Sequence, residues 1–371
     1  MGSDGLQIAM FSSLISQVEA NCELASSHQA GSFSLCGLLM RLRLLYKWKH
    51  GLPPWREPEP EAILAWIADQ ESAWDEREGE PWQKLRLNGL SLDPFEVEQV
   101  NTFLEPGGLA YGAGFCRGLA PTFFLGELSE VRRDGDLTIL VLGRELARDL
   151  DGTPAMRQGS LIYARRQALA YYLWDRLADP SQQDNRFLKA GWSSNEAPLA
   201  DLLQDAQGHQ EVWERLVSGE LEAVIHHELG EARETALDQA LPAILELFPH
   251  TPLDHWIRAL KDALADLNDQ GRLSYLISQQ RLPSLALMLA FQPGFYPLLL
   301  PELEPAFFTL TASGDWEVME ETRVSALARL RQVAGEVTDL FAEPKNQDPD
   351  HLRENLTSRF LAPLGLTTPG E

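Results

Sequence analysis

The stretch GELEAVIHHELGEARETALDQA (219–240) shows most clearly which kind of structure this chain forms. At about 100° of rotation per residue, its apolar side chains gather on one side of a helix, and His227 lies with acidic side chains on the opposite side. The apolar stripe consists of Leu221, Ile225, Leu229, Ala232 and Ala236. The stretch therefore predicts an amphipathic helix that covers a core with one face and exposes an acidic face.

Helical periodicity recurs along most of the chain, but one region differs. Residues 109–142 are rich in glycine and aromatic residues, and Asp134-Gly135 separates two apolar runs in the manner of a β-hairpin. We therefore predict a mainly α, multi-helical fold with a small β-hairpin near residues 122–142. The predicted helices are 8–29, 33–50, 60–78, a short one beginning at Pro94, 157–178, 197–217, 219–240, 253–269 and 316–342.

The length of 371 residues favours two domains rather than one core. The sequence DGTP (151–154) separates the hairpin region from a stretch that reads as helical almost throughout. We place a boundary there, which gives an N-terminal helical region with the hairpin (1–153) and a C-terminal helical domain (154–371).

The formal net charge of −24 argues against nucleic acid as a partner, because phosphate binding requires clustered Lys and Arg. Such a surface can still attract cations or a basic protein. The three cysteines show no metal-ligand or disulfide spacing, so we expect reduced thiols and a cytoplasmic protein. The N-terminal residues lack the basic region of a signal peptide.

Residues 284–312 are apolar over a span that could cross a bilayer, but four prolines interrupt them at intervals of four residues. Each proline removes a helix hydrogen bond and costs about 3 kcal/mol or more in a helix interior. We therefore expect no membrane span here but a buried chain of short turns, with a docking groove as the alternative.

Two features of the N-terminal region also have a structural and a functional interpretation. The predicted helix 33–50 has a basic face with Arg41, Arg43, Lys47 and Lys49, for which we expect ion pairs with carboxylates rather than membrane docking. Tryptophan is abundant in the first quarter of the chain, and core packing is favoured over a partner-binding surface.

The sequence His227-Glu228-Leu229-Gly230-Glu231 raises the question of a metal site. It differs from the zincin signature H-E-x-x-H in having Glu in place of the second His. His227 and Glu231 are one helical turn apart and could bind one cation, and Glu228 would then be the general base. Gly230 supports this interpretation, because glycine inside a helix costs roughly 0.5–1 kcal/mol and suggests a neighbouring backbone packed closely.

The exchange of His for Glu gives a donor set rich in oxygen, which suits Mn or Fe at least as well as Zn. A third ligand is not identified by spacing, and Glu246, His250 and His255 are the candidates considered. The alternative is an exposed acidic helix face that contains one histidine. For the adjacent His226, a structural role is favoured over a catalytic one.

The chain also resembles an uncharacterised bacterial protein family of unknown function. The segments that carry the resemblance are NCELASSHQAGSFSLCGLLMRLRLLYKWKHGLPPW (21–55), LAYGAGF (109–115), LGRELARDL (142–150) and HHELGE (226–231). The resemblance covers most of the chain and implies no activity, cofactor or partner. Two functional hypotheses therefore remain open: a metal-binding protein that acts as a metal-dependent hydrolase, and a non-catalytic protein-interaction or scaffold protein.

Overall fold

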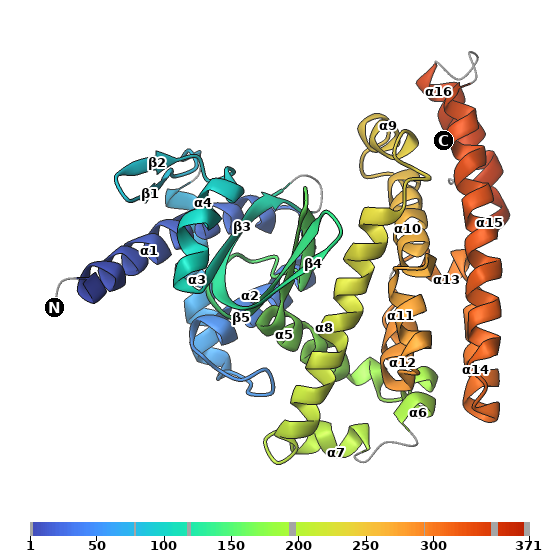
Figure 1. The fold of residues 1–371 in the computed structure, drawn as a ribbon, viewed down its shortest axis with the longest axis horizontal. Coiled ribbons are helices and arrows are strands. Elements are labelled where there is room, and N and C mark those ends of the chain that lie inside the picture. Colours follow the sequence, from blue (N-terminus) through green and yellow to red (C-terminus); the bar gives the residue numbers. More distant parts are fainter. Residues whose placement is uncertain are drawn as a thin grey trace. The chain divides into compact units, whose positions relative to one another are not determined.

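The computed structural model describes residues 3–77, 79–116, 120–192, 198–292, 294–342 and 348–366. The chain divides into two compact units, residues 1–178 and 179–371 (Figure 1). Helices predominate, so the predicted mainly α fold is confirmed. The predicted boundary after residue 153 falls within unit 1, between two strands of its sheet.

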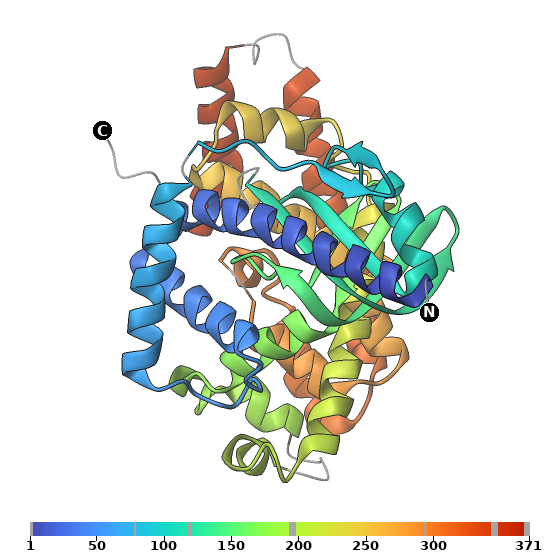
Figure 2. The same ribbon diagram turned by 90° about the vertical axis from the view of Figure 1, so that its left-hand side faces the viewer.

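The second and third helices of unit 1 begin and end within two residues of where the sequence places them. The Ser34 hydroxyl caps the second helix by accepting from the Gly37 amide (3.2 Å), and Pro60 occupies the first turn of the third. The long first helix packs across two strands of the sheet, β4 (Pro121–Asp134) and β5 (Leu137–Arg148) (Figure 2). The helices are α1 (Ser3–Ala30), α2 (Leu35–Lys49), α3 (Pro60–Glu76), α4 (Val97–Leu104) and α5 (Arg166–Leu177).

The basic face of α2 is paired with carboxylates, as expected. Arg43 contacts both Glu57 (2.5 Å) and Asp175 (2.7 Å). Lys47 is fully buried, and its ammonium lies 2.6 Å from Glu57. These ion pairs tie α2 to the segment that follows it and to α5.

The predicted hairpin is present as β4 (Pro121–Asp134) and β5 (Leu137–Arg148). Asp134 pairs with Leu137 across the turn, and Gly135 has a φ of 58°, a left-handed conformation that favours glycine. The Asp134-Gly135 signal therefore located the turn correctly.

The hairpin belongs to a larger sheet than predicted, with the order β3-β4-β5-β7-β6. The strand β7 lies parallel to β5, whereas the other neighbours are antiparallel. The prediction of helix over 157–165 was wrong, because these residues bury apolar side chains against β5 and helix α5 begins only at Arg166. The further strands are β3 (Leu109–Phe115), β6 (Ala155–Gln158) and β7 (Leu161–Arg165), and β1 (Leu85–Leu87) with β2 (Leu90–Leu92) forms a separate ribbon.

The glycines of β3 leave room for side chains. A Cβ at Gly112 would lie 2.1 Å from the ring of Phe124, its partner on β4. A Cβ at Gly114 would lie 1.1 Å from Nε2 of Gln158, which belongs to the opposite edge strand β6. The sheet thus curls until the Gln158 side chain of one edge strand lies against the backbone of Gly114 on the other.

Unit 2 is helical throughout its described residues. Its core gathers large apolar side chains from several helices, among them Trp256, Leu264, Phe307 and Leu330. The helices are α6 (Arg186–Trp192), α7 (Leu199–Gln204), α8 (Gln210–Arg233), α9 (Ala240–Leu247), α10 (Pro252–Leu267), α11 (Arg272–Ser278), α12 (Leu282–Ala290), α13 (Tyr296–Leu299), α14 (Leu303–Ser313), α15 (Glu317–Ala342) and α16 (Pro349–Leu356).

The helix that the opening stretch predicts begins earlier and ends earlier than expected. Helix α8 runs without interruption from Gln210 through Gly219 and stops at Arg233, and α9 starts only at Ala240. The predicted break near residue 218 was wrong, because a single glycine in a helix costs only about 1 kcal/mol and burial of the apolar face outweighs this cost.

The proline-interrupted segment is buried, as predicted, but it forms the short helices α12, α13 and α14 rather than only turns. Leu285, Leu299 and Phe307 from these helices lie in the core of unit 2. Within the part of the chain that the structure describes, no helix has the length and apolar character needed to cross a bilayer.

Candidate metal centre

Helices α8 and α10 pack against each other in unit 2, and their facing sides carry the candidate site. Helix α10 begins at Pro252 after Thr251, whose hydroxyl accepts from the Asp254 amide (3.4 Å). One side of α10 enters the core. The other side turns two acidic residues, Asp262 and Asp266, toward the end of α8 that carries His227 and Glu231.

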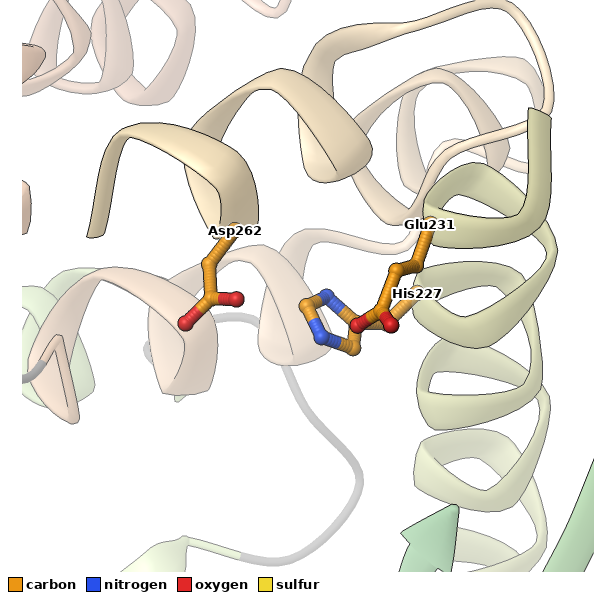
Figure 3. Close-up of side chains that lie close together, drawn as sticks. All are labelled: His227, Glu231 and Asp262. Atoms are coloured by element: carbon orange, nitrogen blue, oxygen red, sulfur yellow. The ribbon is translucent and has the colours of Figure 1, made fainter. Parts of the chain in front are cut away.

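Three side chains from these helices converge. One ligand atom each from His227, Glu231 and Asp262 lie within 4.8 Å of one another. Figure 3 shows the side chain of Asp262 on α10 directed toward those of His227 and Glu231 on α8. All three residues are half-buried, so solvent and small ligands can reach them. His227 and Glu231, the two residues that the sequence singled out, thus lie close together, as their spacing of one helical turn predicts.

Sequence reasoning missed the third residue. Asp262 comes from α10, whereas Glu246, His250 and His255 are not part of this group. A signal was present, because Asp262 and Asp266 are one turn apart on a helix whose other side is strongly apolar. The sequence does not tell which helix packs against α8. Without this information, the two aspartates cannot be assigned to the same site as His227 and Glu231.

The imidazole of His227 is held in one orientation by Asp266. Its Nδ1 lies 2.8 Å from Asp266 Oδ1, which places a proton on Nδ1 and directs Nε2 away from the aspartate. Metal-binding histidines commonly donate their second ring N–H to a carboxylate in this way, because the contact fixes the tautomer and makes the other nitrogen a better ligand. His227 therefore has the partner that a metal ligand needs.

Asp266 is itself fixed on several sides. It is fully buried, and it accepts from Arg272 Nη2 (2.6 Å) and from the Tyr296 hydroxyl (2.7 Å). Burial alone would raise the pKa of Asp266, but the charges of Arg272 and His227 outweigh it and hold this pKa well below its usual range. The aspartate is thus an anion under ordinary conditions and a firm anchor for the imidazole.

The same contacts act on His227. Burial would lower the pKa of its imidazole, but the charge and hydrogen bond of Asp266 raise it to about 9, with smaller contributions from Glu228 and Asp262. Without a bound metal ion, the imidazole of His227 therefore carries protons on both nitrogens and a positive charge at neutral pH. A metal ion that binds Nε2 replaces the proton on that nitrogen, so metal binding releases acid.

The two carboxylates of the site lie beside a lysine. Glu231 Oε1 is 2.6 Å from Lys261 Nζ, and the side chains are 19% and 30% exposed, respectively. Burial raises the pKa of Asp262, and the charges of His227 and Lys261 act against this increase. The site thus concentrates negative charge that nearby cations compensate.

Glu228, the predicted general base, is buried, with 8% of its surface exposed. It is not one of the three converging residues. Its charge nevertheless reaches the imidazole, because it contributes to the raised pKa of His227. Its catalytic role stays a prediction.

Gly230 allows the two helices to approach closely. A Cβ at this position would lie 2.1 Å from the Ala265 carbonyl oxygen and 2.9 Å from the Gly271 Cα. The Gly230 carbonyl in turn accepts from the Asn268 side-chain amide (2.7 Å). A neighbouring backbone therefore explains this glycine, as the sequence suggested.

His226 has different surroundings from those of His227. Its ring stacks on Tyr275 at a centroid distance of 4.2 Å, and its Nδ1 lies 3.1 Å from the Gln270 carbonyl oxygen. These contacts agree with the structural role favoured for it. The predicted alternative, an exposed acidic face on α8, holds only in part, because Glu220 is buried and His227 and Glu231 are half-buried where α10 packs against α8.

Two family models match the chain, and together they cover most of it. Residues 13–165 match the N-terminal domain of a family of unknown function, DUF6866, and residues 170–359 match its C-terminal domain. The chain belongs to this family. The candidate centre lies within the segment that matches the C-terminal domain, and the resemblance to an uncharacterised family is confirmed. No curated protein and no solved structure matches the chain.

Proposed function

We propose that this member of the DUF6866 family binds a divalent transition-metal cation through His227 Nε2 and the carboxylates of Glu231 and Asp262. The observation that carries the proposal is that His227, Glu231 and Asp262, from two helices, each bring one ligand atom into the same small region, with the imidazole already oriented by Asp266. One nitrogen and two carboxylate donors suit Mn²⁺ or Fe²⁺ as well as Zn²⁺. Because these ligands lie on helices and His227 is held by a hydrogen bond, they need little rearrangement to bind a metal ion.

We further propose that the bound metal supports hydrolysis. Three protein ligands leave coordination positions for water, as in catalytic rather than structural sites, and a metal ion lowers the pKa of bound water toward neutrality. Glu228 would be the general base in this reaction. Two observations support this role: Glu228 is next to His227 in the sequence, and its charge contributes to the raised pKa of the imidazole.

The metal proposal is tested by elemental analysis of tag-free protein and by calorimetric titration with Mn²⁺. We expect near-stoichiometric metal in the wild type and at least a 100-fold weaker affinity in His227→Ala, since loss of even an outer-shell partner costs about 10–100-fold. His226→Ala is the matched control, because this neighbouring histidine lies outside the cluster, and it should retain the metal. Equal binding by the wild type and His227→Ala would refute the site.

The hydrolase proposal is tested with Glu228→Gln in a screen of chromogenic esters and phosphate esters in the presence of Mn²⁺. We expect unchanged metal affinity and a decrease of the rate by a factor of about 10²–10⁴, the usual contribution of a general base. A variant with full activity would remove Glu228 from the mechanism. Metal binding without any hydrolysis by the wild type would favour a non-enzymatic role for the metal.

The second candidate is a protein-interaction role, and one observation favours it. Leu35, Leu39 and Met40 on α2 are 72%, 41% and 44% exposed, and such apolar side chains gathered on one helix are typical of binding surfaces. Here the proposal is that α2 contacts a protein partner. Replacement of Leu35 and Leu39 by Ser should leave the melting temperature unchanged. It should also abolish any oligomer that the wild type shows in sedimentation experiments. An unchanged sedimentation coefficient would count against α2 as a contact surface.

We also propose a cytoplasmic location. It rests on the cysteines, because the buried Cys22 thiol donates to the Phe123 carbonyl (3.1 Å) as a reduced thiol does. Fractionation of the source cells would test it, and recovery outside the cytoplasm would contradict it.

A further inference from the structure

Lys261 occupies an unusual position beside the candidate metal centre. It immediately precedes Asp262 on α10, and its ammonium lies 2.6 Å from Glu231 Oε1 on α8. One positive charge is therefore placed against a carboxylate that the metal would use. We propose that Lys261 substitutes for the cation in the metal-free protein and, once the metal displaces it, makes the metal-loaded site a receptor for an oxyanion. This inference rests on the proposed function.

The first step of the argument is the competition for Glu231. A divalent cation that binds a Glu231 oxygen reduces the negative charge available to the ammonium, and the two positive charges repel each other. Lys261 has a long, flexible stem and is 30% exposed, so its ammonium can move away into solvent without unfolding α10. The ion pair is thus broken at low cost when the metal arrives.

The second step concerns the charge of the loaded site. The two carboxylates of Glu231 and Asp262 neutralise a divalent cation, and a metal-bound His227 is neutral. The displaced Lys261, which directly precedes Asp262 on α10, is then a positive charge near the metal that no longer pairs with Glu231. An oxyanion can bind the metal with one oxygen and accept hydrogen bonds from the ammonium with another, as charge-assisted contacts favour.

Other cations near the site are already engaged, which leaves this role to Lys261. Arg272 binds Oδ2 of the buried Asp266 (2.6 Å), the carboxylate oxygen that does not contact the imidazole. Arg258, one turn before Asp262, pairs with Asp254 on its own helix (2.5 Å). Lys261, in contrast, pairs with Glu231, which is itself a proposed metal ligand.

The test is a titration of full-length, metal-free wild type, Lys261→Met and Lys261→Arg with Mn²⁺. The titration is made without and with inorganic phosphate, kept below the concentration at which manganese phosphate precipitates. Without phosphate, Lys261→Met should bind Mn²⁺ about two- to fivefold more tightly than the wild type, because the ion pair between Lys261 and Glu231 no longer competes with the metal. Phosphate should tighten Mn²⁺ binding about five- to tenfold in the wild type and in Lys261→Arg, by reciprocal coupling, and less than about twofold in Lys261→Met.

The outcomes separate this inference from the proposed function. If Lys261→Met binds Mn²⁺ more weakly than the wild type, with an unchanged melting temperature, the lysine supports Glu231 and the inference is wrong. An equal phosphate effect in all three proteins overturns the oxyanion role. If neither the wild type nor Lys261→Met binds Mn²⁺, the metal centre itself is refuted, and the inference with it.

Discussion

At the scale of single residues, the contact between His227 and Asp266 organises the candidate centre. A buried aspartate fixed by Arg272 and Tyr296 leaves the imidazole one favoured orientation and one nitrogen for a ligand. The sequence pointed to His227. The orientation of its imidazole, however, depends on Asp266, Arg272 and Tyr296, which the sequence did not single out.

The replacement Asp266→Asn should weaken Mn²⁺ binding by about 10–100-fold, because the amide provides a weaker hydrogen-bond partner for Nδ1 and no negative charge. Calorimetric titration measures the effect. Tyr296→Phe removes only one hydrogen bond to Asp266 and should have a smaller effect on affinity. If Asp266→Asn binds as tightly as the wild type, the orientation of the imidazole does not depend on this contact.

The stability of the metal-free protein should depend on pH through His227. The folded protein raises its pKa from 6.5 to about 9, so the protonated form stabilises the fold fully below pH 6.5, and this contribution is lost as pH rises through 9. The loss amounts to at most about 3–4 kcal/mol, from about 1.4 kcal/mol per pKa unit. Urea unfolding at pH 6 and pH 9.5, compared with His227→Gln, would measure it; an equal pH dependence in the two proteins would contradict the raised pKa.

The metal-ligand spacing was predictable at this scale, and the third ligand was not. A turn of helix separates His227 from Glu231 in any α-helix, so local sequence determines their common face. Asp262 joins them because α10 packs against α8, and such a contact between distant segments leaves no local pattern.

At the scale of elements, the close approach of α8 and α10 depends on Gly230. Its missing side chain leaves space for the backbone at Ala265 and Gly271, and the metal ligands lie one turn or less from this contact. The separation of the two helices and the geometry of the site are therefore coupled.

Gly230→Ala should lower the free energy of unfolding by about 1–3 kcal/mol, since the added methyl group would meet backbone atoms that cannot move aside. It should also weaken Mn²⁺ binding by separating Glu231 from Asp262. The matched control is Gly335→Ala in α15, where a Cβ meets no atom within 4 Å, and it should stabilise the protein by roughly 0.5–1 kcal/mol. Chemical denaturation checks both, and a neutral Gly230→Ala would contradict the close contact.

The elements themselves were predicted with unequal success. Amphipathic helices such as α2 and α10 have a periodicity that the sequence displays, and the Asp134-Gly135 turn has a specific backbone requirement. Strand β7 was mistaken for a helix, because its short run Leu161–Arg165 is buried beside β5 and a run of this kind has no period that distinguishes strand from helix.

At the scale of the whole molecule, the ligands and their supporting residues all belong to unit 2. The residues of its core also come from this unit, and the two family domains meet between residues 165 and 170, close to the division at residue 178. Unit 2 therefore contains its own core and all the residues of the proposed metal centre.

A fragment of residues 179–371 should fold and bind Mn²⁺ with an affinity within about threefold of the full chain, because domains with their own core fold alone. Circular dichroism and calorimetric titration check both parts. A folded fragment that does not bind would show that the centre needs residues from unit 1.

The small number of lysines gives the ion pair at Glu231 a practical consequence. The chain has six, and they are Lys47, Lys49, Lys84, Lys189, Lys261 and Lys345. An amine-reactive reagent should modify Lys261 slowly while its ammonium is held by Glu231, and Lys47, fully buried, should serve as an unreactive internal standard. Peptide mapping after brief acetylation would thus report occupancy of the centre from the labelling of one residue, in cell extract as well as in purified protein.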